Sequence, residues 1–342
     1  MKNNLLKLRN IKPASIEASA KVVTHSLLEH ENGSIPIIRC HTGLDIQTWA
    51  SDNTEVVNSL FDNHGVVLLR GFNISEEIGF YNFTRQFTQN LMDYTESSTP
   101  RTRVGDKVYT STEYPKDEHI PMHNEHSYST HWPQKVWFHC VTPATTGGET
   151  PLADSRKVLA YISPETVEKF RKKGVMYVRN YGSHIDLHWK SVYNVETKDE
   201  LEAYCLKNGI QFEWTDKGLR TRQVCQGLFT HPEKGAEVWF NQAHLFHMSN
   251  LAPHVQEYLL SYYGKEGLPR NTYYGDGSEI EPEVLTEIRN AFNNCLITFD
   301  WQKNDVVMVD NVLYAHGRFP FDGPRKVLVA MADPYHHQFQ QQ

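Results

Sequence analysis

The chain has 342 residues, of which 39% are hydrophobic and 12% aromatic, and its formal net charge is -7. This is enough for one large enzyme domain, whereas the acidic balance, without a basic stripe, disfavours a nucleic-acid-binding protein. A mean hydropathy of -0.55 and the lack of a long apolar run argue against a membrane span. We expect a single domain over 1–342, with a core at about 60–335 and an N-terminal extension, 1–50, packed on it.

Cysteine usage and short motifs exclude several classes of protein. The five cysteines are odd in number and form no CxxC pair; they are Cys40, Cys140, Cys205, Cys225 and Cys295. Zinc fingers, iron–sulfur clusters and a disulfide framework therefore lack support, and free thiols of a cytoplasmic protein are expected. The N-terminus has no apolar segment typical of a signal peptide. No GxGxxG or GxxxxGK[ST] motif is present.

The first predicted elements lie before residue 95. A short helix from about Val57 ends near Gly65, and GVVLLRGF (65–72) reads as a buried strand. Ser75 is placed to cap a second helix. Apolar side chains spaced three to four residues apart form one face of that helix: Phe80, Phe83, Phe87 and Leu91.

The middle of the chain mixes strands with well-marked helix starts. VWFHCV (136–141) and VMYVRNY (175–181) are predicted strands. Between them, Ser163 followed by Pro164 predicts a helix that ends at Gly174. Further on, Thr197 and Glu200 have the spacing of a capping box.

Strands dominate the last third. The predicted elements are a strand at 236–242, a helix at about 284–295 and strands at 305–311 and 325–333. This order favours a mainly β fold with helical insertions, a sandwich or jelly roll, over regular βαβ alternation.

Three short patterns have the spacing of a metal-binding pair. They are His123-Asn124-Glu125, His184-Ile185-Asp186 and His231-Pro232-Glu233. Residues i and i+2 of an extended segment point to the same side, so each pair could offer a nitrogen and an oxygen to one cation. A further histidine would complete a two-histidine, one-carboxylate set of the kind that binds iron(II). A single such match is more often structural, and spacing alone does not choose among the three.

The context of the first pair favours it. It is followed by Gly147-Gly148-Glu149-Thr150, and His316 stands nine residues before Arg325 near the end of the chain. A histidine ending one strand and an arginine on the next antiparallel strand can face the same interior. The planar guanidinium of the arginine could donate two hydrogen bonds to a carboxylate, and a threonine hydroxyl would add another. This order of residues suits a metal-chelating dicarboxylate.

Six blocks carry a resemblance that covers nearly the whole chain. They are SSTPRTRVGDKVYTSTEYP (97–115), MHNEHSYSTHWP (122–133), GGETPLADSR (147–156), GLRTR (218–222), EVWFNQAHLFH (237–247) and DNVLYAHGRFPFDGPRKVLVAM (310–331). The sequence resembles the Fe(II)/2-oxoglutarate-dependent dioxygenases of the TauD/TfdA superfamily, and more narrowly their SyrP-like branch of amino-acid hydroxylases. The resemblance implies a double-stranded β-helix (jelly-roll) core flanked by α-helices.

The resemblance also implies the roles of five residues. His123, Glu125 and His316 would bind Fe(II), while Arg325 would pair with the distal carboxylate of the cosubstrate 2-oxoglutarate and Thr150 would support it. The family more often has Asp where this chain has Glu125. Related halogenases have a small residue there so that halide reaches iron, so Glu125 favours hydroxylation with O₂, or a related desaturation or cyclisation.

The substrate is less well determined. The branch implies an amino-acid-type substrate of nonribosomal-peptide biosynthesis, free or tethered to a peptidyl carrier protein. Four residues are candidates to bind it: Arg101, Trp239, Asn241 and Arg318. Each has a structural alternative, as do Arg103, Arg220, Arg222 and the basic run 171–173. Other readings of the chain are a desaturase, epoxidase or free-amino-acid hydroxylase, a silent jelly-roll binding protein, and a hydrolytic zinc enzyme.

Overall fold

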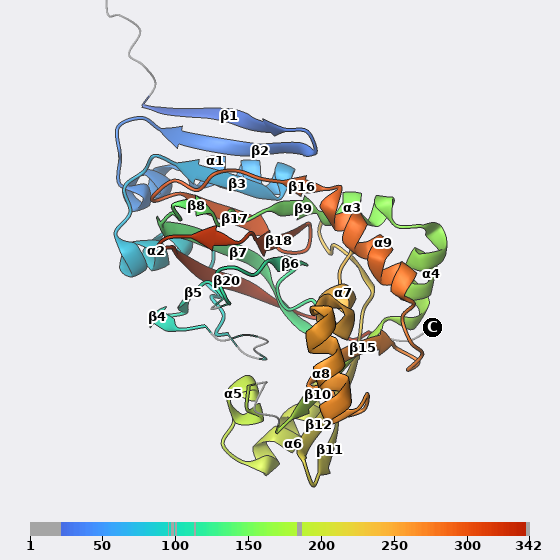
Figure 1. The fold of residues 1–342 in the computed structure, drawn as a ribbon. Coiled ribbons are helices and arrows are strands. Elements are labelled where there is room, and N and C mark those ends of the chain that lie inside the picture. Colours follow the sequence, from blue (N-terminus) through green and yellow to red (C-terminus); the bar gives the residue numbers. More distant parts are fainter. Residues whose placement is uncertain are drawn as a thin grey trace, which may run out of the picture.

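The computed structural model describes residues 22–94, 96, 99, 101–112, 114–182 and 187–339. A large eight-stranded sheet forms the scaffold, with the strand order β1-β2-β3-β17-β7-β20-β5-β4 (Figure 1). Its strands, in chain order, are β1 (Val23–His30), β2 (Gly33–Cys40), β3 (Val66–Arg70), β4 (Arg103–Gly105), β5 (Val108–Thr110), β7 (His131–Thr142), β17 (Val306–Asp310) and β20 (Lys326–His336). The long pair β7 and β20 runs antiparallel through its centre.

The central strands are buried on both faces. On β17, Val307 and Val309 belong to the core between the sheets, while Val306 and Met308 belong to the core on the opposite face. Successive side chains of a strand alternate between its two faces, so both cores need apolar residues. This explains why the strand runs in the sequence are continuously apolar instead of alternating.

A four-stranded sheet faces the large one. Its order is β16-β9-β18-β6, and its strands are β6 (Ile120–His123), β9 (Leu152–Asp154), β16 (Leu296–Ile297) and β18 (Tyr314–Arg318). Residues of both sheets, such as Leu152 and Val329, share one core cluster. The chain thus has the jelly-roll arrangement of two packed sheets that its pattern predicts. A short pair, β8 (Thr146–Gly147) and β19 (Phe321–Asp322), lies beside it.

Helices cover the outer face of the large sheet and one end of the small one (Figure 1). They are α1 (Ile46–His64), α2 (Glu76–Thr84), α3 (Ser155–Tyr161), α4 (Pro164–Lys173), α7 (Ala243–Phe246), α8 (Pro253–Tyr263) and α9 (Pro282–Asn293), with the 3-10 turn η1 (Met248–Asn250). Helix α1 ends at Gly65, as predicted, because its φ of 75° is open to glycine at low cost.

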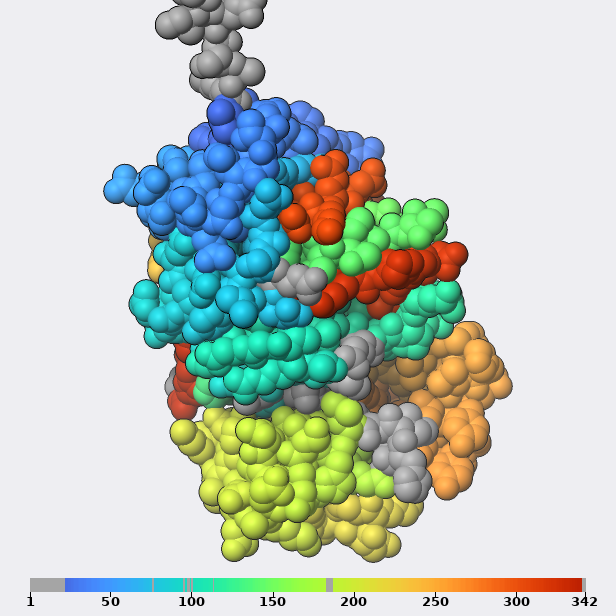
Figure 2. All heavy atoms as spheres, turned by 90° about the vertical axis from the view of Figure 1, so that its left-hand side faces the viewer, coloured from blue at the N-terminus to red at the C-terminus, as the bar shows by residue number. Residues whose placement is uncertain are grey.

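A separate lobe is built on a second four-stranded sheet of order β11-β12-β10-β15. Its elements are β10 (Val175–Tyr181), α5 (Trp189–Tyr193), α6 (Lys198–Lys207), β11 (Gln211–Thr215), β12 (Gly218–Cys225) and β15 (Arg270–Tyr274). The short pair β13 (Leu228–Thr230) and β14 (Glu237–Trp239) leads back to the core. This lobe and the N-terminal strands lie at opposite ends of the molecule (Figure 2).

Several local predictions are confirmed and others are corrected. The capping box joins Thr197 and Glu200. Helix α2, however, ends at Thr84, whose hydroxyl bonds the Tyr81 carbonyl, so Phe87 is buried beyond the helix. Leu91 likewise lies past its end. The strand predicted at 236–242 is only three residues long.

The N-terminal residues that the structure describes belong to the main sheet. Strand β2 pairs in parallel with β3, and β1 forms a hairpin with β2. The remaining N-terminal residues, 1–21, lie outside the described part. Among the described residues, no helix is both long and apolar enough to cross a bilayer.

Candidate metal centre and its cavities

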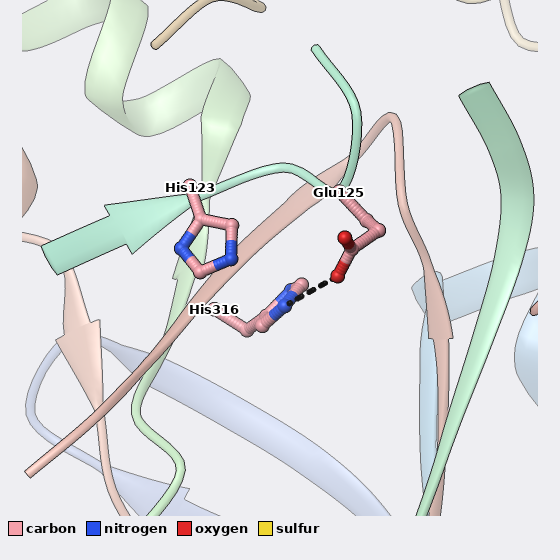
Figure 3. A group of neighbouring side chains, drawn as sticks. All are labelled: His123, Glu125 and His316. Carbon is pink, nitrogen blue, oxygen red and sulfur yellow. Dashed lines mark ion pairs between the residues drawn. The ribbon is translucent and has the colours of Figure 1, made fainter. Parts of the chain in front are cut away.

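Three side chains converge between the two sheets. His123 ends β6, Glu125 follows it by two residues, and His316 lies on β18 (Figure 3). One ligand atom from each lies within 4.8 Å of the others. His316 Nε2 is 3.7 Å from Glu125 Oε2. Two imidazoles and one carboxylate at this spacing form a donor set suited to a non-haem iron(II) ion, which leaves other coordination positions open.

The backbone orients the first histidine for metal binding. His123 Nδ1–H donates a hydrogen bond to the Pro121 carbonyl oxygen, 2.8 Å away, so the lone pair is on Nε2. Burial, followed by the neighbouring His316, lowers the pKa of His123 to about 4. The ring is therefore neutral near pH 7, as a metal ligand must be. His316 Nδ1 is buried without a hydrogen-bond partner in the described chain.

A reciprocal amide clamp holds the backbone of Glu125. Asn311 accepts from the Glu125 amide at 2.6 Å and donates to the Glu125 carbonyl at 2.9 Å. In turn Asn124 donates to the Asn311 carbonyl at 2.7 Å. Both asparagines are fully buried. No role was predicted for either asparagine, and the one signal for them in the sequence is their position within two of the motif blocks.

The carboxylate of Glu125 pairs with a buried arginine. Arg101 Nη2 donates to Glu125 Oε2 at 2.8 Å, and both side chains are about 95% buried. Burial opposes ionisation of the carboxyl, but the Arg101 charge and then His316 hold the pKa of Glu125 well below its usual value. Glu125 is therefore negative at neutral pH, and a cation beside it is favoured.

A narrow cavity between the sheets joins His123 and His316 to the predicted 2-oxoglutarate residues. His316, Thr150 and Arg325 line it together. Arg325 donates to the Gly148 carbonyl at 2.9 Å and approaches the Thr150 hydroxyl at 3.5 Å. Among the residues that the structure describes, no carboxylate forms an ion pair with Arg325. Burial and the charge of Arg318 lower its pKa to about 10, so an anion entering here would relieve an uncompensated charge.

A much larger cavity opens on the other side of the same histidine. It encloses about 590 Å³ and is lined by His123 and Glu125 at its inner end and by α7, η1 and α8 farther out. His123 and Arg101 line both cavities, so the two meet at the three converging side chains. This volume is in the range of small-molecule sites. Gln242, for which no role was predicted, lines it as well.

Two of the four predicted substrate residues lie elsewhere. Trp239 is fully buried against Phe170, with ring centroids 4.7 Å apart, because strand β14 turns it into the core. Asn241 is fully buried and bonds the backbone of Gly227 and Ala243. Neither residue lines the cavities, which corrects the prediction that they contact substrate.

The other two predicted substrate residues do reach the site. Arg101 lies at the junction of the cavities, as described above. Arg318 lines the narrow cavity, and it donates to three backbone carbonyls, those of Tyr114, Pro115 and Glu118. These bonds fasten the 114–118 loop to β18. A contact of Arg318 with substrate stays a prediction.

The remaining candidates are explained by local pairing. His231 Nε2 lies 3.0 Å from Asp310 Oδ2, and its Nδ1 accepts from the Glu233 amide, so this pair builds a turn. His184-Ile185-Asp186 lies outside the described residues. The other arginines considered and the basic run form ion pairs with acidic side chains: Arg103 with Asp106, Arg220 and Arg222 with Glu213, Arg171 and Lys172 with Glu168, and Lys173 with Asp276. All five cysteines are free and buried.

Comparison with known proteins gives one family and two curated relatives. The family model described as "Taurine catabolism dioxygenase TauD, TfdA family" matches residues 33–331. The dapdiamide synthesis protein DdaC of Enterobacter agglomerans is 42% identical over 279 residues, covering 81% of this chain and 85% of that protein. A clavaminate synthase-like protein of Arabidopsis thaliana is 29% identical over 318 residues, covering 90% and 92% of the two chains.

Solved structures share the fold at low sequence identity. PvcB of Pseudomonas aeruginosa superposes with a TM-score of 0.53 at 16% identity, with 92% of each chain covered. A second PvcB structure, described as an Fe, alpha-ketoglutarate dependent oxygenase, gives a TM-score of 0.52. AAD-2 in complex with Mn(II) and N-oxalylglycine gives 0.52 at 14% identity, covering 90% of this chain and 97% of that one.

Proposed function

Because the chain belongs to the TauD, TfdA family and is an Fe(II)- and 2-oxoglutarate-dependent dioxygenase, we propose that it hydroxylates an unactivated C–H bond of an amino-acid-type substrate. His123, Glu125 and His316 hold the iron in this proposal. The observation that carries it is the convergence of their ligand atoms within 4.8 Å at the junction of two cavities. Each cavity then has a separate occupant.

The narrow cavity takes the cosubstrate. Arg325 receives the distal carboxylate of 2-oxoglutarate, and the Thr150 hydroxyl adds a hydrogen bond, since both line this cavity beside His316. Thr150 is itself oriented by the Trp301 indole N–H, which donates to it at 3.1 Å. A buried guanidinium without a carboxylate partner among the described residues is well suited to bind an anion.

When bound, iron and 2-oxoglutarate supply oxygen activation coupled to decarboxylation of the cosubstrate. The chain's own residues bind and orient the reactants and exclude water from the site. The buried amide clamp on Glu125 fixes one donor, and the pairing of β6 with β18 fixes the other two. No side chain has to act as a nucleophile or as a general base.

The large cavity takes the substrate. The relationship to a dapdiamide synthesis protein supports a place in secondary-metabolite biosynthesis, such as that of an antibiotic. The substrate is an amino-acid unit, free or tethered to a peptidyl carrier protein. Glu125 occupies the position that a halide would need, so transfer of oxygen is favoured over halogenation. Desaturation, epoxidation or cyclisation on the same site would be distinguished by product mass.

The first test uses the metal-free protein under anaerobic conditions. Addition of Fe(II) and 2-oxoglutarate should produce the visible charge-transfer band of the chelate, and His123→Ala should not produce it. Amino acids, free and carrier-bound, are then screened for substrate-dependent formation of succinate after O₂ is admitted. If the wild-type protein gives no band and binds zinc tightly instead, the hydrolytic zinc enzyme becomes the better reading.

A further inference from the structure

Arg101 carries more hydrogen-bond donors than the surrounding chain satisfies. Its Nη2 donates to Glu125 and lies 3.4 Å from the Thr112 hydroxyl. Its Nε and Nη1 are buried and have no partner among the described residues. The guanidinium also stacks on the Tyr94 ring, 4.4 Å from its centroid, which fixes its plane. A buried donor left without an acceptor is costly, so a missing acceptor is expected here.

The position of Arg101 indicates where that acceptor comes from. Arg101, Thr112, Ile120 and His123 line both the narrow and the large cavity. A molecule in the large cavity therefore reaches Arg101 at its inner end, beside the proposed iron ligands.

The balance of charge at this junction favours an anion. The described lining of the narrow cavity contains three guanidinium groups, Arg101, Arg318 and Arg325, and no carboxylate. Among the residues that the structure describes, Glu125 is the one acid at the junction, and the iron ion would add two positive charges. Counted over these described groups, positive charge remains in excess even with both carboxylates of 2-oxoglutarate in place. Buried charges need a counter-charge, and a substrate carboxylate would supply one.

Gln242 provides a hydrogen-bond acceptor, in contrast to the donors of Arg101. Its side-chain nitrogen donates to the Asn124 carbonyl at 2.8 Å, which fixes the orientation of the amide. Its oxygen therefore remains as the acceptor, and no described residue donates to it. Gln242 lines the large cavity together with Arg101. The pair can receive a carboxylate and an N–H from one molecule.

We propose that Arg101 binds a carboxylate of the substrate next to the oxidised carbon, and that the Gln242 oxygen accepts an N–H of the same molecule. This rests on the proposed function and narrows the substrate to a carboxylate-bearing amino-acid unit. Two sources can supply the carboxylate. One is the α-carboxylate of a free amino acid, and the other is the side chain of an acidic amino acid held as a thioester.

The experiment uses the anaerobic Fe(II)–2-oxoglutarate complex of the full chain. The twenty amino acids are added as free acids, and aspartyl, asparaginyl, glutamyl and glutaminyl units are added as pantetheine thioesters. Binding is read from the change in the charge-transfer band. We expect compounds with a carboxylate to bind, and a carboxylate to bind roughly 30-fold or more tightly than its matched carboxamide.

The two groups of compounds distinguish the two sources of the carboxylate. The experiment also distinguishes failure of this proposal from failure of the proposed function. A free amino acid that binds while its thioester does not identifies the α-carboxylate. An aspartyl or glutamyl thioester that binds while its amide counterpart does not identifies the side chain. Carboxylate-free thioesters that bind equally well, or a panel in which no acid binds, would overturn the proposal. The band itself forms before any substrate is added, so its absence would reject the proposed function instead.

Variants of Arg101 test whether this residue binds the carboxylate of the substrate. Arg101→Gln should remove the preference for the acid, and Arg101→Lys should retain part of it. Arg103→Gln is the matched control, because Arg103 is exposed two residues away and pairs with Asp106. An Arg101→Gln protein that needs more 2-oxoglutarate but keeps its acid preference would show that Arg101 serves the cosubstrate, and the proposal would fail.

Discussion

His123 and His316 are paired residues on neighbouring antiparallel strands, and their rings lie 4.5 Å apart between centroids. The strand pairing is interrupted immediately after His316, between His316 and Arg318. At Gly317 a Cβ atom would come within 2.7 Å of the Ile120 carbonyl oxygen, so only glycine fits there. The two histidines are thus held by the sheet itself and not by a mobile loop. The site should therefore keep its geometry without metal.

The first prediction concerns these two histidines. His316→Ala should abolish the charge-transfer band of the Fe(II)–2-oxoglutarate complex and all succinate formation, because two donors no longer define a stable iron site. Metal affinity, measured by competition with a chelator, should fall by at least about tenfold. The control is His254→Ala on the exposed surface of α8, which should bind iron as the wild type does. Iron binding by His316→Ala at wild-type affinity would reject the ligand assignment.

The second prediction concerns the cosubstrate. Arg325→Leu should raise the 2-oxoglutarate concentration needed for half-maximal turnover by roughly 30-fold or more, since a desolvated charge-assisted pair would be lost. The concentration that Arg325→Lys needs should lie between those of the wild type and Arg325→Leu, because lysine keeps the charge but not the planar guanidinium that can form two parallel hydrogen bonds. Lys116→Ala removes an exposed cation paired with Asp322 and serves as the control. Cosubstrate dependence that is unchanged in Arg325→Leu would refute the assignment.

Elements whose signals are local could be predicted from the sequence. The end of α1 at Gly65 and the capping box at Thr197 depend on the chemistry of one or two residues. The end of α2 could not be predicted, because the apolar spacing continues beyond it to Phe87. That residue is buried in the same core from a turn. Periodicity records which side chains face the core but not whether the backbone between them stays helical.

The site residues that belong to a sequence motif could be predicted, whereas those whose position depends on packing could not. His123, Glu125 and His316 are marked by their spacing and context. Trp239 looked equally suited to a pocket, and only the direction of its short strand places it in the core. The acceptor role of Gln242 depends on a contact with Asn124, more than a hundred residues away. Such long-range contacts have no signal in a single sequence.

The third prediction concerns pH and a buried histidine outside the iron ligands. His244 is 2% exposed; burial and then Arg289 lower its pKa to about 3. In the unfolded chain the group takes up a proton near its ordinary pKa, so between these two values the unfolded state binds more protons. Stability must therefore fall as the pH falls below about 6.5, by roughly 2 kcal/mol at pH 5 from this residue alone.

The measurement is urea unfolding of the metal-free protein at pH 7 and pH 5. His244→Gln keeps a donor for the Met122 carbonyl, which His244 Nε2 contacts at 3.0 Å, but cannot titrate. It should lose less stability on acidification than the wild type does. His254→Gln, at an exposed position, should behave as the wild type. An equal loss of stability in all three proteins would contradict the prediction.

The fourth prediction follows from the ion pair between Arg101 and Glu125. Glu125→Ala leaves a buried guanidinium without its counter-charge, so the metal-free protein should lose about 3–5 kcal/mol of stability. Formate is a carboxylate small enough to occupy the vacated space beside Arg101, and it should restore at least about 1 kcal/mol by binding the folded state. Glu125→Gln removes the charge but fills the space, so formate should stabilise it less than it stabilises Glu125→Ala. Urea unfolding with formate or propionate at equal ionic strength makes the comparison. A response to formate that is the same in the wild type and in both variants would contradict the prediction, because the ion would then not be filling the space that Glu125 leaves.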